Sequence, residues 1–129
     1  MGSATDTFIK KAERRLKRKR VKLEADDEDE FEDWCKTVGI WCIKLVFLFG
    51  KGFPDRTLLC PGGRIIFVEL KRINRRNHKD GGLSPKQKQV REKITELGFP
   101  YYVGYGFKDA KKKVCEELNL KDGSRAGTK

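Results

Sequence analysis

Two apolar stretches joined by a Pro-Gly-Gly turn constrain the fold of this chain more than any other feature. The stretches are TLLC (57–60) and RIIFVELK (64–71), and Pro61-Gly62-Gly63 lies between them. Proline and glycine favour the backbone conformations of a tight turn, so the segment predicts a β-hairpin. A chain of 129 residues is long enough for one domain with a single modest core.

The flanking sequence predicts the other elements. Apolar residues recur at helical spacing at Phe31, Trp34, Cys35 and Val38, which predicts an amphipathic helix that ends at Gly39. The run IWCIKLVFLF (40–49) predicts a mostly buried strand. Core packing is the favoured use of its aromatic residues, and a dimer surface around Trp41, Phe47 and Phe49 is the alternative. Ser84-Pro85 predicts the start of a helix that ends at Gly98. YYVGY (101–105) predicts a short strand, and residues 109–118 a last helix.

Charge is abundant and unevenly distributed. The net charge of +11 favours a polyanionic partner, either nucleic acid or an anionic membrane surface. We expect residues 1–23 to form a basic arm that contacts nucleic acid or serves only as a localisation or solubilising tail. We expect residues 24–120 to form the folded domain and residues 121–129 a frayed tail.

No apolar run is long enough for a membrane span, so a soluble, cytoplasmic protein is expected.

Cysteine and histidine usage narrows the possible chemistry. The four cysteines form no C-x-x-C pair, and His78 is the only histidine, which argues against a zinc site. The same shortage argues against Ser-His or Cys-His nucleophilic catalysis. We expect buried free thiols, and any chemistry must come from carboxylates and lysines.

The end of the second hairpin strand carries such groups. Side chains alternate along a strand, so Glu69 and Lys71 project from one face, roughly 7 Å apart. The hairpin turn brings Asp55 beside Glu69. Two carboxylates and the Leu70 carbonyl would form a partial shell for Mg²⁺, with Lys71 beside it. The alternative is that Glu69 and Lys71 form an ordinary surface ion pair.

Four short motifs resemble one known family. They are GFPDR (52–56), PGG (61–63), FVELK (67–71) and LSPKQ (83–87), in the order and spacing of the VRR-NUC family, a branch of the PD-(D/E)XK nuclease superfamily. The resemblance implies an α/β fold with a restriction-endonuclease-like αβββαβ core and a mixed central sheet, followed here by a C-terminal helix. It also implies a nuclease that depends on Mg²⁺ or Mn²⁺.

The resemblance also assigns roles to individual residues. Asp55, Glu69 and the Leu70 carbonyl match the metal ligands, and Lys71 matches the catalytic lysine. Gln87 matches the glutamine that opens the family's second helix and supports the site, and a purely structural role as the capping-box partner of Ser84 is favoured nearly as much. An acid on the first helix completes the set. The family spacing and the helical projection favour Glu28, with Glu32 in reserve.

Contacts with nucleic acid are the remaining expectation. The candidate residues are Lys44, Arg56, Arg72, Arg75, Arg76 and Lys79. Lys44 has an equal alternative, in which it only extends to solvent from the end of a strand. The resemblance implies a homodimer, of bacterial or phage type, that cuts branched DNA such as four-way (Holliday) junctions. A nuclease that cuts flaps or duplexes, or a non-catalytic binding module on the same fold, is the alternative.

Overall fold

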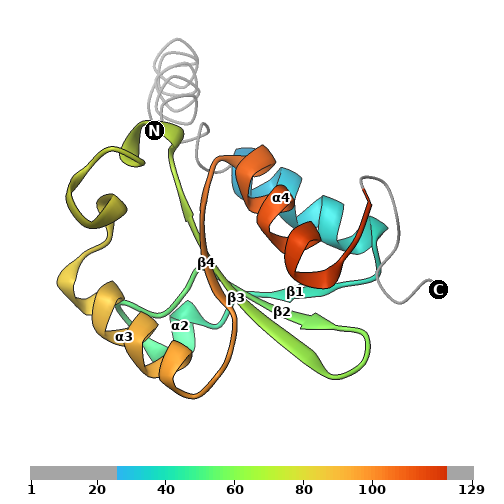
Figure 1. Cartoon of the computed structure of the whole chain (residues 1–129), viewed down its shortest axis with the longest axis horizontal. Helices are drawn as coiled ribbons and strands as arrows, with labels where there is room; N and C mark the ends of the chain where they lie inside the picture. The colour runs from blue at the N-terminus through green and yellow to red at the C-terminus, as the bar shows by residue number, and fades with distance from the viewer. Residues whose placement is uncertain (1–25, 122–129) are drawn as a thin grey trace, which may run out of the picture.

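The structure is a computed structural model and describes residues 26–121. The predicted basic arm (1–23) and nearly all of the predicted tail lie outside the described residues. Figure 1 shows a central sheet with the first helix (residues 26–37) and α4 on one face, and with α2 and α3 on the other. No helix in the described part of the chain is both long and apolar enough to span a membrane.

Four strands form one mixed sheet in the order β1-β2-β3-β4. The strands are β1 (Trp41–Ile43), β2 (Arg56–Cys60), β3 (Arg64–Lys71) and β4 (Tyr101–Tyr105). The β1–β2 and β2–β3 pairs are antiparallel, whereas β3 and β4 are parallel. The Gly62-Gly63 turn joins β2 to β3 with φ values of 82° and 77°, which glycine adopts without strain. This architecture is the predicted restriction-endonuclease-like α/β fold.

The described residues form the three predicted helices, with small shifts in their ends, and one short helix, α2, that was not predicted. The helices are the first helix (residues 26–37), α2 (Val46–Phe49), α3 (Pro85–Glu96) and α4 (Phe107–Leu118). The loop between β3 and α3 contains two short 3₁₀ turns, Ile73–Arg75 and Lys79–Gly82.

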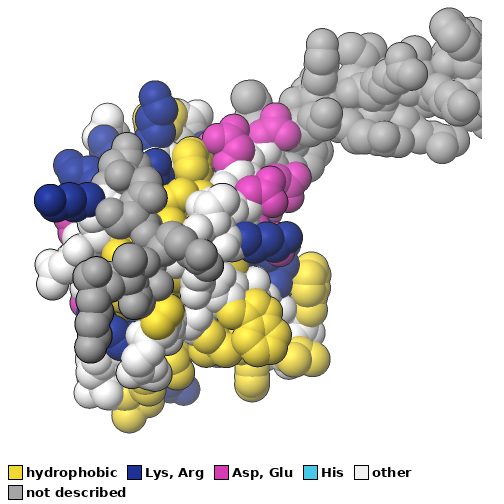
Figure 2. All heavy atoms as spheres, turned by 90° about the vertical axis from the view of Figure 1, so that its right-hand side faces the viewer, with side chains coloured by type: hydrophobic (Ala, Val, Ile, Leu, Met, Phe, Trp, Pro, Cys, Tyr) yellow, Lys and Arg dark blue, Asp and Glu magenta, His cyan; other side chains and the backbone are white. Residues whose placement is uncertain are grey.

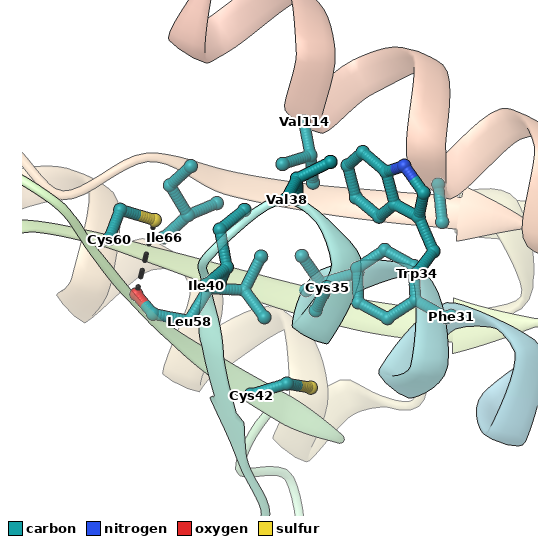
Figure 3. Close-up of a cluster of buried hydrophobic side chains, with 12 residues drawn as sticks. Phe31, Trp34, Cys35, Val38, Ile40, Cys42, Leu58, Cys60, Ile66 and Val114 are labelled. Atoms are coloured by element: carbon teal, nitrogen blue, oxygen red, sulfur yellow. Dashed lines mark hydrogen bonds between the residues drawn. The ribbon is translucent and has the colours of Figure 1, made fainter. Parts of the chain in front are cut away.

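The hydrophobic core lies on the face of the sheet that the first helix and α4 cover (Figure 3). Phe31 and Cys35 of the first helix and Val38, just after its end, are at most 2% exposed. They pack against Leu58 and Ile66 of the hairpin, with Val114 of α4 in the same cluster. Cys35, Cys42 and Cys60 are buried thiols outside any disulfide, as expected, whereas Cys115 is only partly buried.

The segment 40–49 corrects one prediction. The expected strand is only three residues long, and Val46–Phe49 form the single helical turn α2. Its aromatic side chains are not in the core, since Trp41, Phe47 and Phe49 are 64–82% exposed. Lys44 therefore lies just after β1 instead of within it.

Candidate active site

The hairpin register places two acids side by side. Arg56 pairs with Val68, so Asp55 lies one residue beyond that pair and opposite Glu69. The Asp55 Oδ2 accepts a hydrogen bond of 2.8 Å from the Leu70 backbone N–H. Because this bond fixes Asp55 against the end of β3, the position of its carboxylate is set by the sheet and not by a mobile loop.

Glu69 is a buried carboxyl with one unsatisfied oxygen. Glu69 is only 2% exposed. Its Oε2 accepts no hydrogen bond from any of the described residues. Burial, followed by the nearby Asp55 carboxylate, raises the pKa of Glu69 to about 9. An acid in this position is costly for the fold unless a proton or a cation balances its charge.

Gln87 joins the sheet to α3 through both ends of its amide. Its Nε2 donates to Glu69 Oε1 at 3.0 Å, and its Oε1 accepts from Lys71 Nζ at 3.1 Å. The same Oε1 accepts from the Ser84 backbone N–H, while Ser84 Oγ accepts from the Gln87 N–H. One side chain therefore completes the capping box and also contacts the two residues expected at the site, Glu69 and Lys71.

The first helix brings Glu28 to the same place and directs Glu32 elsewhere. Glu28 lies 3.9 Å from the Lys44 ammonium and lines the cleft that contains Glu69. Glu32 pairs with the Arg56 guanidinium at 3.3 Å, on the core side of the sheet. Asp27 accepts a hydrogen bond from the Phe107 N–H at the start of α4. The cleft position favours Glu28 over Glu32 as the acid that serves the site.

These residues line one cleft of about 400 Å³ at the end of β3. Its lining contains every residue proposed for the metal and for catalysis, together with Lys44: Glu28, Lys44, Asp55, Glu69, Leu70, Lys71 and Gln87. The sequence did not predict three further lining residues, Asp27, Val46 and Phe47. Phe47 was missed because the apolar run 40–49 carries no signal that its side chain leaves the core.

Tyr101 is another neighbour that the sequence did not predict. Parallel pairing of β3 with β4 places it opposite Phe67, two residues before Glu69. Burial raises its pKa beyond its usual range, and Glu69 adds to that effect. Such a contact depends on pairing between distant strands, for which the local sequence gives no signal.

The predicted nucleic-acid contacts divide into groups by position. Arg75 and Lys79 line a shallow hollow that also includes Lys71 and Gln87, next to the cleft. Arg76 lies 3.4 Å from Asp109 of α4, and Arg72 lines a separate hollow beside the first helix.

Arg56 is only 6% exposed, and its guanidinium pairs with Glu32. This placement argues against a direct contact between Arg56 and DNA, because strand alternation turns it away from Asp55.

The cleft fits a hard divalent cation in its donor chemistry. Asp55 and Glu69 offer adjacent carboxylates, and the unsatisfied Glu69 Oε2 is an oxygen ligand without a partner. Among residues 26–121, no three acidic, cysteine or histidine side chains are grouped closely enough to hold a metal by themselves. A cation such as Mg²⁺, which retains several water ligands, suits so small a donor set.

Comparison with known proteins agrees with this geometry. No family model matches the sequence, and no curated protein matches it either. A solved structure described as a VRR_NUC domain is 26% identical to this chain, with a TM-score of 0.60. The match covers 71% of this chain and 94% of that one. The chain thus resembles a VRR-NUC domain in fold and in sequence. Its mixed four-stranded sheet is consistent with the wider PD-(D/E)XK superfamily, and the similarity supports a nuclease domain.

Proposed function

We propose that this VRR-NUC-like domain is a divalent-metal-dependent endonuclease that hydrolyses phosphodiester bonds in DNA. One observation carries the proposal. Two adjacent carboxylates, an ammonium group and a bridging amide meet in one cleft, at Asp55, Glu69, Lys71 and Gln87. The two carboxylates offer a cation site. Lys71, two residues after Glu69 on the same face of β3, places a positive charge beside that site.

Each group has a distinct part in the proposed reaction. Asp55, Glu69 and the Leu70 carbonyl would hold Mg²⁺ or Mn²⁺, with Glu28 beside them. The cation would activate a bound water and neutralise charge on the phosphoryl oxygens. Lys71 would orient the attacking water or stabilise the negative charge on the phosphoryl oxygens of the transition state. Gln87 would keep Lys71 and Glu69 in place, because its amide contacts both.

The basic surface beside the cleft supports a DNA substrate. Arg75 and Lys79 adjoin Lys71, and their charges would bind phosphates next to the one being cut. Figure 2 shows that Lys and Arg side chains also gather on one side of the face drawn there, whereas acidic side chains gather beside the grey residues.

We further propose a homodimer acting on branched DNA such as Holliday junctions, because two symmetric cuts need two sites related by a two-fold axis. The homodimer and the branched substrate rest on the resemblance to the VRR-NUC family. β1 pairs only with β2 among the described strands, so its other edge and the exposed Trp41 are open to a second copy. Light scattering on the full chain tests the oligomeric state directly.

Cleavage assays with a panel of DNA substrates test the activity. The wild-type chain is expected to cut at least one of a junction, a flap, a duplex and a single strand in Mg²⁺ or Mn²⁺, and to cut none in EDTA. Asp55→Asn keeps an oxygen that accepts from the Leu70 N–H but removes the charge, so it is expected to lose at least ~100-fold in rate. A wild type that cuts nothing, or an Asp55→Asn variant of unchanged rate, would contradict the assignment and favour a non-catalytic binding module.

Two substitutions in the capping box separate its structural role from its role in the site. Ser84→Ala removes the cap of α3 and is expected to cost about 1 kcal/mol of stability while most activity remains. Gln87→Ala should cost a similar amount of stability and also slow cleavage by ~10-fold or more, because Lys71 and Glu69 lose their common partner. Thermal melts and initial rates measure the two effects. Equal activities of the two variants would show that Gln87 is only a capping residue.

A further inference from the structure

Phe47 combines high exposure with a position in the catalytic cleft. Phe47 is 82% exposed, and it lines the cleft together with Glu69 and Lys71. Isolated exposed apolar residues are common on protein surfaces and need no explanation. An exposed aromatic ring next to the groups that would cut a phosphodiester bond is more specific, because the base attached to that phosphate must lie nearby.

The turn that carries Phe47 is firmly attached to the sheet. Its last residue, Phe49, stacks on Phe53 with ring centroids 4.9 Å apart, and Phe53 packs edge-on against Phe67 of β3. Gly52 adopts φ +90°, and a Cβ there would lie only 2.9 Å from the Lys86 carbonyl oxygen. The chain therefore passes close to α3 at a position where only glycine fits. These contacts join the C-terminal end of α2 and the loop after it to β3 and α3, and they leave Phe47 exposed.

A cation accompanies the ring. The Lys44 ammonium lies 5.3 Å from the centroid of the Phe47 ring and 3.9 Å from Glu28 Oε1. Proteins that bind single-stranded nucleic acid pair positive charge for the backbone with aromatic rings for the bases. Lys44 and Phe47 supply both within one side of the cleft.

We propose that Phe47 stacks on an unpaired base of the DNA strand that lies in the cleft, while Lys44 contacts the adjacent phosphate. The inference deepens the proposed nuclease function and rests on it. A base inside a continuous duplex is stacked between its neighbours and presents no free face. The ring therefore selects DNA with an unpaired nucleotide at or beside the cut, such as a flap, a gap or the centre of a branched structure.

Cleavage of two matched substrates tests this selection. One is a continuous duplex, and the other has the same cut strand with unpaired nucleotides at the cut. Stacking on an aromatic ring is worth about 1–3 kcal/mol per base, so Phe47→Ala should lower kcat/KM on the unpaired substrate by ~5- to 140-fold. The effect on the duplex should be less than about twofold. Phe47→Tyr retains a ring of similar size and should restore most of the activity.

Leu48 provides a matched control on the same turn. It is 78% exposed and apolar but does not line the cleft, so Leu48→Ala should leave both substrates unaffected. Both residues are exposed, and neither substitution should change the melting temperature by more than a degree or two. An equal loss in Phe47→Ala and Leu48→Ala, or an equal loss on the two substrates, would overturn the proposal.

A binding measurement separates the failure of stacking from the failure of the nuclease. DNA with 2-aminopurine at the unpaired position is titrated with the full chain in EDTA, where no cleavage is required. The fluorescence should be quenched by the wild type and by Leu48→Ala but not by Phe47→Ala. Quenching that depends on Phe47 in a chain that cuts nothing would support stacking and refute the nuclease. Quenching that persists in Phe47→Ala refutes stacking, whatever the nuclease activity.

The exposed turn has one other use, as an interface between two copies of this chain. In that case Phe47→Ala and Leu48→Ala would both convert a dimer to a monomer in light scattering. That result, with no Phe47-dependent quenching, would overturn the base-stacking proposal.

Discussion

Replacement of Lys71 by methionine is expected to slow DNA cleavage by roughly 10²- to 10³-fold, the effect typical of losing one preorganised electrostatic group. Methionine keeps much of the length of the side chain but removes its charge and its hydrogen bond to Gln87. The ammonium of Lys71 is held at 3.1 Å by the Gln87 amide oxygen, on the same face of β3 as Glu69. The ammonium is therefore positioned before any substrate binds. A water molecule that took its place would have to reorient as charge develops in the transition state.

Binding of the metal should respond differently from the rate. Lys71→Met leaves Asp55 and Glu69 unchanged and removes a positive charge beside them, so Mn²⁺ affinity is expected to remain or to rise. Isothermal titration with Mn²⁺ and single-turnover cleavage measure the two quantities separately. Lys112→Met, on the exposed surface of α4, is the matched control and should cut at the wild-type rate.

The outcome for Lys71→Arg sharpens the interpretation. A planar guanidinium cannot occupy the place of a compact ammonium, so arginine is expected to restore little of the rate. A rate within about threefold of wild type for Lys71→Met would show that Lys71 has no part in the reaction and serves only as a hydrogen-bond donor to Gln87.

The central part of the candidate site was predictable from the sequence because it depends on short-range geometry. A turn of defined length fixes the register of a hairpin, and the register places Asp55 opposite Glu69. Alternation along β3 then places Lys71 on the same face. The capping motif sets where α3 begins, and this brings Gln87 to the end of the strand.

The errors have physical reasons of two kinds. The run 40–49 is apolar throughout, and such a run does not distinguish a buried strand from an exposed turn. The neighbourhood of Tyr101 and Glu69 was missed because it depends on the parallel pairing of β3 with β4. The contact of Arg56 with DNA stays a prediction, although its burial and the alternation of strand residues argue against it.

Glu69→Gln is expected to abolish metal-dependent cleavage and yet to stabilise the metal-free protein at neutral and alkaline pH. The loss of activity follows from the loss of a charged ligand beside Asp55. The gain in stability follows from burial, since a carboxyl that is 2% exposed must either stay protonated or be buried as a charge. Glutamine avoids both costs. Its side-chain oxygen can still accept the hydrogen bond that the Gln87 amide donates to Glu69 Oε1 in the wild type.

The pH dependence of stability follows from the direction of the pKa shift. The folded pKa of Glu69, at about 9, lies above its ordinary value of 4.5, so the folded protein binds the proton more tightly than the unfolded chain. The free energy of unfolding contributed by this group therefore falls as pH rises from about 4.5 to 9, by up to ~1.4 kcal/mol per pH unit. Below that window the group contributes no difference, and above it the loss is complete.

Thermal melts of both proteins across this pH range, with and without Mg²⁺, provide the measurement. In EDTA the wild type should lose stability relative to Glu69→Gln as the pH rises from 5 to 9, with the variant more stable by a few kcal/mol at pH 8. Addition of Mg²⁺ should raise the melting temperature of the wild type but not that of the variant, because only the wild type gains a bound ligand. A variant that is less stable than wild type at pH 8 in EDTA would show that Glu69 supports the fold. A variant that is inactive but more stable would show that the chain retains a buried acid at a cost to its own stability, which is expected of a residue kept for binding a cation and not for folding.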